Sequence, residues 1–148
     1  MKEERYKALY LENQLCFPLY ACAKEVTRQY RPFLDRYGIT YTQYIALLAL
    51  WEYGPMHLED LGEKLMLDSG TLTPLLKKLE EKGYLLREKD PEDKRNLILS
   101  VSEKGFALRE EALIIPGQIG SCLHLSKEEA LTLYHLLYKT INNMKESA

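Results

Sequence analysis

The fold of this chain is decided by the stretch DSGTLTPLLKKLE at residues 68–80. Asp68 or Ser69 can cap a helix here, because a short polar side chain accepts hydrogen bonds from the first N–H groups of a helix. Pro74 falls early in this helix, and Gly83 follows as a stop signal. The stretch therefore predicts a capped helix that ends near Gly83.

The neighbouring segments give the order of the elements. Thr40 or Thr42 can cap an earlier helix that ends before Gly54, and a short helix is expected at about residues 57–65. After the helix of residues 68–80 come two short strands, 84–89 and 96–101, joined by the polar turn 90–95. Three short helices followed by a two-stranded hairpin is the order of a winged helix-turn-helix.

Apolar residues at helical spacing predict further helices on both sides of this core. The first stretch runs from about Ala8 to Tyr37, and Pro32 should bend or interrupt it. Another helix is expected to begin at Ser102 and to be interrupted at residues 115–117, and Ser126 opens a final helix with a capping box. The predicted fold is mainly α with a small β-hairpin, an α+β winged helix-turn-helix in a single domain of residues 1–148.

Composition limits the class of protein. The 148 residues include 46% hydrophobic and 28% charged residues, as in an ordinary folded domain. Three cysteines, an odd number, exclude a full set of internal disulfides. The first residues lack the apolar core of a signal peptide, and no apolar run is long enough to cross a bilayer. We therefore expect a protein of the reducing cytoplasm without a membrane partner.

The predicted helix-turn-helix has side chains suited to DNA. A net charge of −2 gives no global basic excess, but one basic face is enough for phosphate contacts. Small polar residues at a helix start can approach phosphates and base edges, and a basic hairpin tip can enter the minor groove. The alternative is a capped helix and a solvated face, because acidic and basic residues nearly balance between Lys77 and Lys104. The candidate DNA-binding residues are Ser69, Thr71, Thr73, Lys77, Lys78, Lys94 and Arg95.

Cys16 is the main candidate for chemistry. If a helix starts near Phe17, Pro18 lies in its first turn and Cys16 lies at its positive end, which favours the reactive thiolate. The alternative is inert packing, which is the usual role of a cysteine among apolar residues. Cys22 lies six residues further on, so it should face another way on a helix, and we expect it in the core.

The chain closely resembles the MarR family of dimeric winged-helix regulators, and within it the organic-hydroperoxide-sensing repressors known as OhrR. The turn DPEDKR at residues 90–95 looks like the wing motif of the family. The motifs similar to the OhrR group are LENQLCF at residues 11–17, ITYTQY at 39–44 and LDSGTLTPLLKKLE at 67–80. The resemblance extends from about residue 10 to the C-terminal helix.

The resemblance implies a homodimer held by residues 1–38 and 105–148, with a DNA-binding lobe at residues 39–104. In such proteins the reduced dimer binds double-stranded operator DNA, and oxidation of the N-terminal cysteine by an organic hydroperoxide releases it. Cys16 matches that redox sensor. Tyr30 and Tyr41 match two tyrosines that hold the sensor of the partner subunit, and a phenol O–H can stabilise a thiolate.

The resemblance leaves the fate of the oxidised cysteine open. Some members of the group use a low-molecular-weight thiol, and others have a second cysteine that forms a disulfide between subunits. Cys122 resembles that second cysteine in its location, so it is a candidate resolving cysteine for Cys16 of the partner chain. The alternative is a small apolar residue near the dimer interface, because a disulfide requires geometry that a sequence does not give.

Other functions have weaker support from the sequence. A peroxidase or hydrolase with Cys16 as nucleophile needs a positioned base, and His57, His124 and His135 lie in no recognisable catalytic setting. No Cys/His pair has the spacing of a structural zinc site. We therefore expect no enzyme, no metal and no cofactor. A MarR-type regulator that responds to other oxidants or to small phenolic ligands is the main alternative, and a purely structural interaction module is the third.

Overall fold

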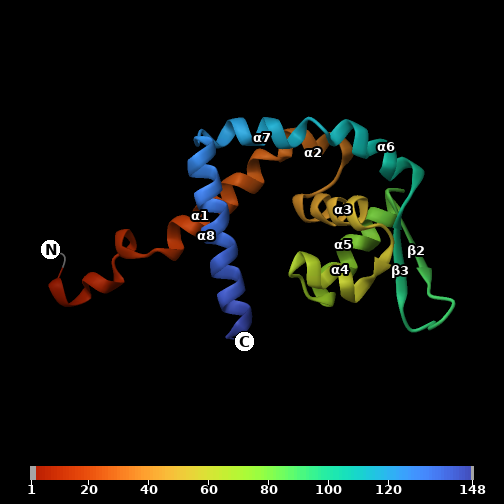
Figure 1. The fold of residues 1–148 in the computed structure, drawn as a ribbon, viewed down its shortest axis with the longest axis horizontal. Helices are drawn as coiled ribbons and strands as arrows, with labels where there is room; N and C mark the ends of the chain where they lie inside the picture. The colour runs from red at the N-terminus through yellow and green to blue at the C-terminus, as the bar shows by residue number, and fades with distance from the viewer. Residues whose placement is uncertain (1–2, 148) are drawn as a thin grey trace. The chain divides into compact units, whose positions relative to one another are not determined.

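The computed structural model describes residues 3–147 and consists of two compact units, one extending to Ile115 and one beginning at Pro116. It is mainly helical, with one small antiparallel sheet (Figure 1), which confirms the predicted fold class. Within the described residues, no helix is both long enough and apolar enough to cross a membrane.

The α-helix of the N-terminal segment begins later than the sequence predicts. Instead of a helix from about Ala8, two short 3-10 turns come first, and their end is held by the Gln14 amide, which donates to the carbonyls of Ala8 and Tyr10. Such side-chain bonds to the backbone compete with helix formation. The elements are η1 (Glu4–Leu9), η2 (Leu11–Asn13), α1 (Cys16–Gln29), α2 (Arg31–Leu34) and η3 (Asp35–Tyr37). The predicted interruption at Pro32 is confirmed, since α1 ends before it.

The winged-helix lobe follows the predicted order with one addition. Its elements are α3 (Tyr41–Tyr53), β1 (Met56–His57), α4 (Leu58–Leu65), α5 (Ser69–Glu81), β2 (Leu85–Lys89), β3 (Leu97–Val101) and α6 (Glu103–Ala112). The predicted two-stranded hairpin is part of a three-stranded sheet in the order β1-β3-β2, because Met56 pairs with Leu99 on the free edge of β3. A strand of two residues is too short to show the alternation that identifies strands in a sequence.

Leucines from the helices and the sheet form the core of this lobe. They are each less than 2% exposed, and burying one such side chain contributes about 1.5–3 kcal/mol. Because the buried face of α5 consists of these leucines, its polar residues must face outward. The core leucines are Leu47, Leu50, Leu61, Leu72, Leu76, Leu79, Leu85 and Leu99.

The C-terminal helices are α7 (Ile115–Leu123) and α8 (Lys127–Glu146). The predicted break at residues 115–117 lies slightly earlier, between Ala112 and Ile115, and Pro116 stands in the first turn of α7, where its missing N–H costs little. Ser126 caps α8 through the predicted capping box with Glu129.

Both α1 and α8 present apolar side chains to solvent in the single chain. No described residue of either helix is buried, and Leu15, just before α1, is 85% exposed. The expectation that Cys22 lies in the core is therefore wrong for the single chain, in which this thiol is exposed. The buried residues of the first unit belong mostly to the winged-helix lobe, so α1 contributes no core of its own.

Close packing at the start of α6 gives a test of the fold. A Cβ atom on Gly105 would overlap the Tyr84 carbonyl oxygen and the Val101 side chain, whereas nothing lies within 4 Å of one on Gly117. We expect Gly105→Ala to lower the free energy of unfolding by about 1–3 kcal/mol, as overpacking usually does. Gly117→Ala is the matched control. Chemical denaturation of both variants measures the difference, and equal stabilities would contradict the packing described here.

Candidate functional site

Helix α5 presents five of the seven residues predicted to contact DNA. Asp68 caps this helix by accepting the Thr71 N–H at 2.7 Å, and this bond holds the pKa of Asp68 below its usual range. The Thr71 hydroxyl also bonds to Asp68, at 3.2 Å. Among the α5 candidates, this hydroxyl is therefore less available for DNA than the other side chains. All five candidates of α5 are exposed, as the apolar face requires: Ser69, Thr71, Thr73, Lys77 and Lys78.

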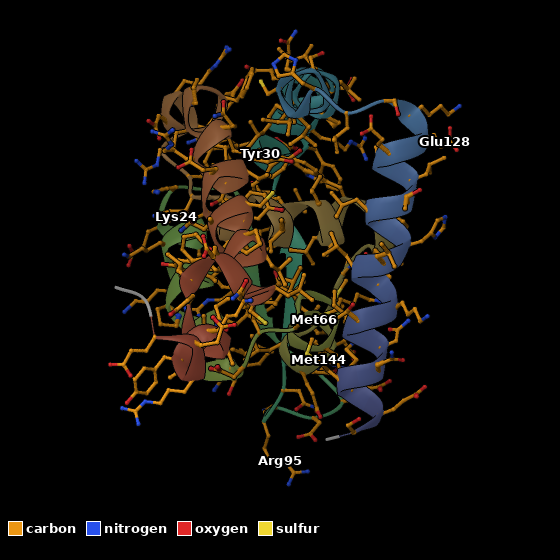
Figure 2. The ribbon with its side chains drawn as sticks, turned by 90° about the vertical axis from the view of Figure 1, so that its left-hand side faces the viewer. Lys24, Tyr30, Met66, Arg95, Glu128 and Met144 are labelled. Carbon is orange, nitrogen blue, oxygen red and sulfur yellow. The ribbon has the colours of Figure 1, made fainter. Side chains whose placement is uncertain are left out.

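The wing is the loop between β2 and β3, and it carries the other two candidates, Lys94 and Arg95. Both are exposed, and Figure 2 shows Arg95 projecting from the end of the wing. The Arg95 guanidinium donates to both carboxylate oxygens of Asp93, at 3.0 and 3.1 Å, which holds the pKa of Asp93 below its usual range. Arg95 is therefore paired with a neighbouring carboxylate at the tip of the wing while its side chain stays exposed.

A contact that the sequence did not predict holds the base of the wing. His57 Nε2 lies 2.8 Å from Asp90 Oδ2, and Asp90 Oδ1 accepts the Glu92 N–H at 2.9 Å. The Glu92 N–H and then His57 lower the pKa of Asp90, so its carboxylate is ionised at neutral pH. These residues lie 33 positions apart and meet because β1 joins the sheet, a strand with no sequence signal.

Cys16 is the first residue of α1, which meets the condition of a helix start near Phe17, and its thiol is exposed in the single chain. Pro18 stands in the first turn of the helix. The helix N-terminus points N–H groups toward this end, an arrangement that favours a bound anion. Cys122 lies in α7, in the second unit, and is also an exposed free thiol.

Tyr30 and Tyr41 lie together, and a third tyrosine completes the cluster. Their ring centroids are 4.8 Å apart, and Tyr44 lies 5.6 Å from Tyr30 and 6.3 Å from Tyr41. Burial, followed by the neighbouring Tyr41 and Tyr44, raises the pKa of Tyr30 to about 12. Burial also raises the pKa values of the other two. The phenols therefore stay protonated and available as hydrogen-bond donors.

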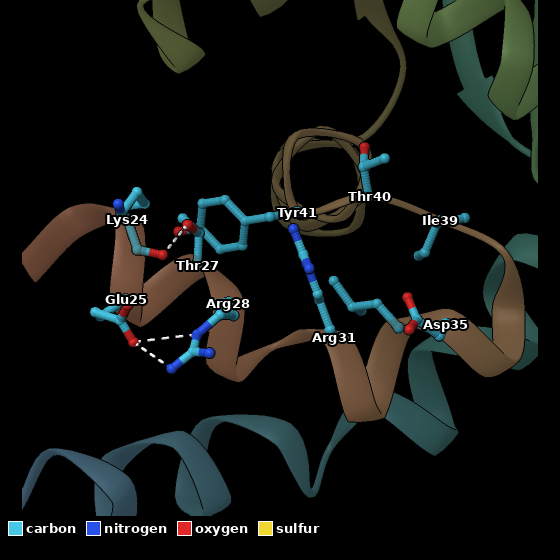
Figure 3. A pocket seen from close by; sticks show the side chains of 10 residues that line it. Lys24, Glu25, Thr27, Arg28, Arg31, Asp35, Ile39, Thr40 and Tyr41 are labelled. Carbon is cyan, nitrogen blue, oxygen red and sulfur yellow. Dashed lines mark hydrogen bonds and ion pairs between the residues drawn. The ribbon is translucent and has the colours of Figure 1, made fainter. Parts of the chain in front are cut away.

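A pocket of about 570 Å³ lies between α1, α2 and the start of α3, and Tyr41 lines it (Figure 3). Lys24, Arg28 and Arg31 line it as well, and Arg28 is paired with Glu25 at 2.6 Å. Figure 3 shows Arg31 extending from α2 toward the start of α3. The pocket thus combines basic side chains with one phenol of the tyrosine cluster.

A metal site has no support in the described part of the chain. Between residues 3 and 147, no group of three or more His, Cys, Asp or Glu side chains is placed to hold a metal ion.

Comparisons with known proteins place these features in a family. The model of the MarR family matches residues 39–97, which lie in the winged-helix lobe. The organic hydroperoxide resistance transcriptional regulator of Bacillus subtilis (strain 168) is 44% identical over 144 residues, 97% of this chain and 98% of that protein. The HTH-type transcriptional regulator SarZ of Staphylococcus haemolyticus is 39% identical over 137 residues, 93% of each chain.

Solved structures give the same result. A structure of reduced AbfR bound to DNA has a TM-score of 0.78 and 36% identity, and the match covers 95% of this chain and 98% of that one. A structure of disulfide-formed AbfR has a TM-score of 0.65 and 37% identity, covering 96% and 97%.

These relatives are transcriptional regulators rather than enzymes, which confirms the expectation of a non-enzymatic role. The similarity extends over nearly the whole chain, far beyond the winged-helix lobe alone. The chain belongs to the MarR family of transcriptional regulators.

Proposed function

We propose that this protein is a redox-sensing repressor that binds operator DNA and releases it when organic hydroperoxides oxidise Cys16. The observation that carries the proposal is the exposed thiol at the start of α1, together with the protonated pair Tyr30 and Tyr41, in a chain so similar to the Bacillus subtilis regulator. The relative's name connects it to organic hydroperoxides, and AbfR has been solved on DNA.

DNA binding follows from the two exposed surfaces of the winged-helix lobe, residues 39–104. The exposed face of α5 fits the major groove, with Ser69 and Thr73 toward bases and phosphates and Lys77 and Lys78 along the backbone. Arg95 at the wing tip fits the minor groove, where the negative potential attracts arginine, and Lys94 adds phosphate attraction.

A second copy of the chain is the partner that we propose for the apolar faces of α1 and α8. Soluble monomers seldom expose large contiguous apolar patches, and here several large apolar side chains of both segments are exposed. The proposed dimerisation elements are residues 1–38 and 105–148. A two-fold dimer presents its two α5 helices about 34–36 Å apart, one turn of DNA. The exposed apolar residues are Leu9, Leu11, Leu15, Phe17, Leu19, Leu131, Leu133, Leu136 and Met144.

The proposed chemistry begins with the Cys16 thiolate. It attacks the terminal oxygen of the hydroperoxide, the O–O bond breaks, and the alkoxide leaves as an alcohol after taking a proton. The cysteine becomes a sulfenic acid and the peroxide is reduced. The Tyr30 and Tyr41 phenols of the other copy of the chain would donate to the thiolate before this step, since their raised pKa values keep them protonated.

A disulfide completes the switch. A second thiol attacks the sulfenic sulfur and water leaves, which joins Cys16 either to Cys122 of the other copy or to a low-molecular-weight thiol. AbfR has been solved on DNA in an overoxidised form and, separately, in a disulfide-formed state. This favours a disulfide, rather than added oxygen alone, as the state that shifts the dimer and changes the separation of its α5 helices.

A second candidate function is supported by the pocket beside Tyr41. Lys24 and Arg31 in its lining would attract the carboxylate of a small phenolic acid, while Glu25 and Asp35 also line it and Arg28 is paired with Glu25. Such a ligand would shift α3 without any oxidation. Release of DNA after oxidation of Cys16 by oxidants other than organic hydroperoxides is a variant of the first proposal. A ligand of this kind would release DNA from wild type and from Cys16→Ser alike, whereas oxidant sensing requires the thiol.

The first prediction concerns Cys16. We expect Cys16→Ser to bind operator DNA as wild type does but to stay bound when cumene hydroperoxide is added, because a hydroxyl does not form a sulfenic acid. Gel-shift titrations with and without the peroxide measure both properties. Cys22→Ser is the control and should still release DNA. Peroxide-driven release by Cys16→Ser would refute the assignment of the sensor.

The second prediction concerns Cys122. After cumene hydroperoxide treatment, we expect wild type to run at dimer mass on a non-reducing denaturing gel and Cys122→Ser to run at monomer mass. A reducing agent should return wild type to monomer mass. A wild-type band that stays at monomer mass would exclude the Cys16–Cys122 disulfide and leave the low-molecular-weight thiol.

The third prediction concerns Arg95. We expect Arg95→Ala to weaken operator binding about tenfold and to reduce the slope of log affinity against log salt by about one, because one groove or phosphate contact is lost. Arg109→Ala removes an exposed arginine of α6, outside α5 and the wing, and should leave the salt slope unchanged. Fluorescence anisotropy at several salt concentrations measures both variants. An unchanged slope for Arg95→Ala would place the wing off the DNA.

A further inference from the structure

Gln43 is almost fully buried, at 2% exposure, and stands on α3 between Tyr41 and Tyr44 of the tyrosine cluster. Both polar ends of its side chain are engaged. Its Oε1 accepts the Thr40 N–H at 2.9 Å, and its Nε2 donates to the Leu75 carbonyl oxygen at 3.2 Å. One side chain thus joins the first turn of α3 to the backbone of α5.

The first of these contacts fixes the turn that carries Tyr41. Gln43 also donates its backbone N–H to the Thr40 hydroxyl at 3.3 Å, which completes a reciprocal capping box. Tyr41 is the first residue of α3, so the orientation of its side chain depends on this turn.

The second contact fixes α5 in a way that apolar packing does not. The buried leucines of α3 and α5 attract one another without a preferred direction, so the helices could slide or rotate by small amounts. A hydrogen bond to a backbone oxygen has a required direction, and losing it would leave a buried amide donor unpaired. Leu75 lies between Thr73 and Lys77. The bond to its carbonyl therefore sets the rotation of α5 about its axis and how closely α5 approaches α3.

We infer that Gln43 is the positioning residue that couples the state of the sensor site to the pose of α5. The inference rests on the proposed function, because it takes Tyr41 as part of the sensor site and α5 as the DNA-contacting helix. When oxidation of Cys16 disturbs Tyr41, the first turn of α3 moves, and the buried amide of Gln43 moves the Leu75 backbone with it. Oxidation of the Cys16 sulfur thereby changes the orientation of the helix that faces DNA.

Three variants separate the two contacts of Gln43. Gln43→Glu keeps an acceptor for the Thr40 N–H and, in its ionised form, has no donor for the Leu75 carbonyl. Gln43→Met has a similar length and no donor or acceptor, so it removes both side-chain bonds without a buried charge. Thr42→Ala is the matched control, because it removes an exposed hydroxyl of the same turn and leaves the capping box and both side-chain bonds of Gln43 in place.

The experiment measures oxidation and release separately on the full-length variants. Trapping of the sulfenic acid with dimedone, followed by mass spectrometry, gives the rate at which Cys16 is oxidised. Fluorescence anisotropy gives operator affinity before and after cumene hydroperoxide. The ratio of these affinities is the coupling factor, and such factors are typically about 5–150-fold.

We expect both Gln43 variants to oxidise at the rate of wild type and their coupling factor to fall toward one, while Thr42→Ala retains the wild-type factor. Gln43 variants that lose affinity equally in both redox states, with the coupling factor unchanged, would show a merely structural role and overturn the inference. A wild-type coupling factor of one, with Cys16 converted to a disulfide, would instead overturn the proposed function itself.

Discussion

Burial of the leucine face of α5 is the constraint on which the rest of the structure depends. Leu72, Leu76 and Leu79 are almost completely excluded from solvent, so α5 is held in one approximate rotation about its axis, with its leucine face toward the core. That rotation turns Thr73 and Lys77 outward and aims the Leu75 carbonyl at Gln43. The outward face and the connection to α3 are therefore two results of the same packing.

Local signals explain why much of the fold could be predicted. Each helix cap is a bond between residues three apart, so Thr40, Asp68, Ser102 and Ser126 all marked helix starts correctly. Contacts between residues that are far apart in the chain have no comparable signal in the sequence. The strand β1 is two residues long, and His57 meets Asp90 only because this strand joins the sheet. The start of α1 depends on side-chain bonds from Gln14, which compete with the helical pattern.

The candidate site divides in the same way. The sequence, through its motifs, indicated Cys16, Tyr30 and Tyr41, but the proximity of the two rings and the raised pKa values result from packing. Tyr44 and Gln43 belong to the same motif, ITYTQY, yet nothing in the spacing distinguishes them from core residues. Their roles depend on which neighbours they touch across the lobe, and those neighbours lie far away in the chain.

Pairing Arg95 with Asp93 leaves the wing tip nearly neutral before DNA arrives, since Glu92 also lies beside Lys94. Long-range attraction to phosphates depends on local charge and governs how fast a protein finds DNA. If the proposed DNA contacts are made, the exposed Lys77 and Lys78 supply the attraction during the encounter with DNA. Arg95 would act after encounter, when a groove competes with Asp93 for its guanidinium, and so set how long the complex lasts.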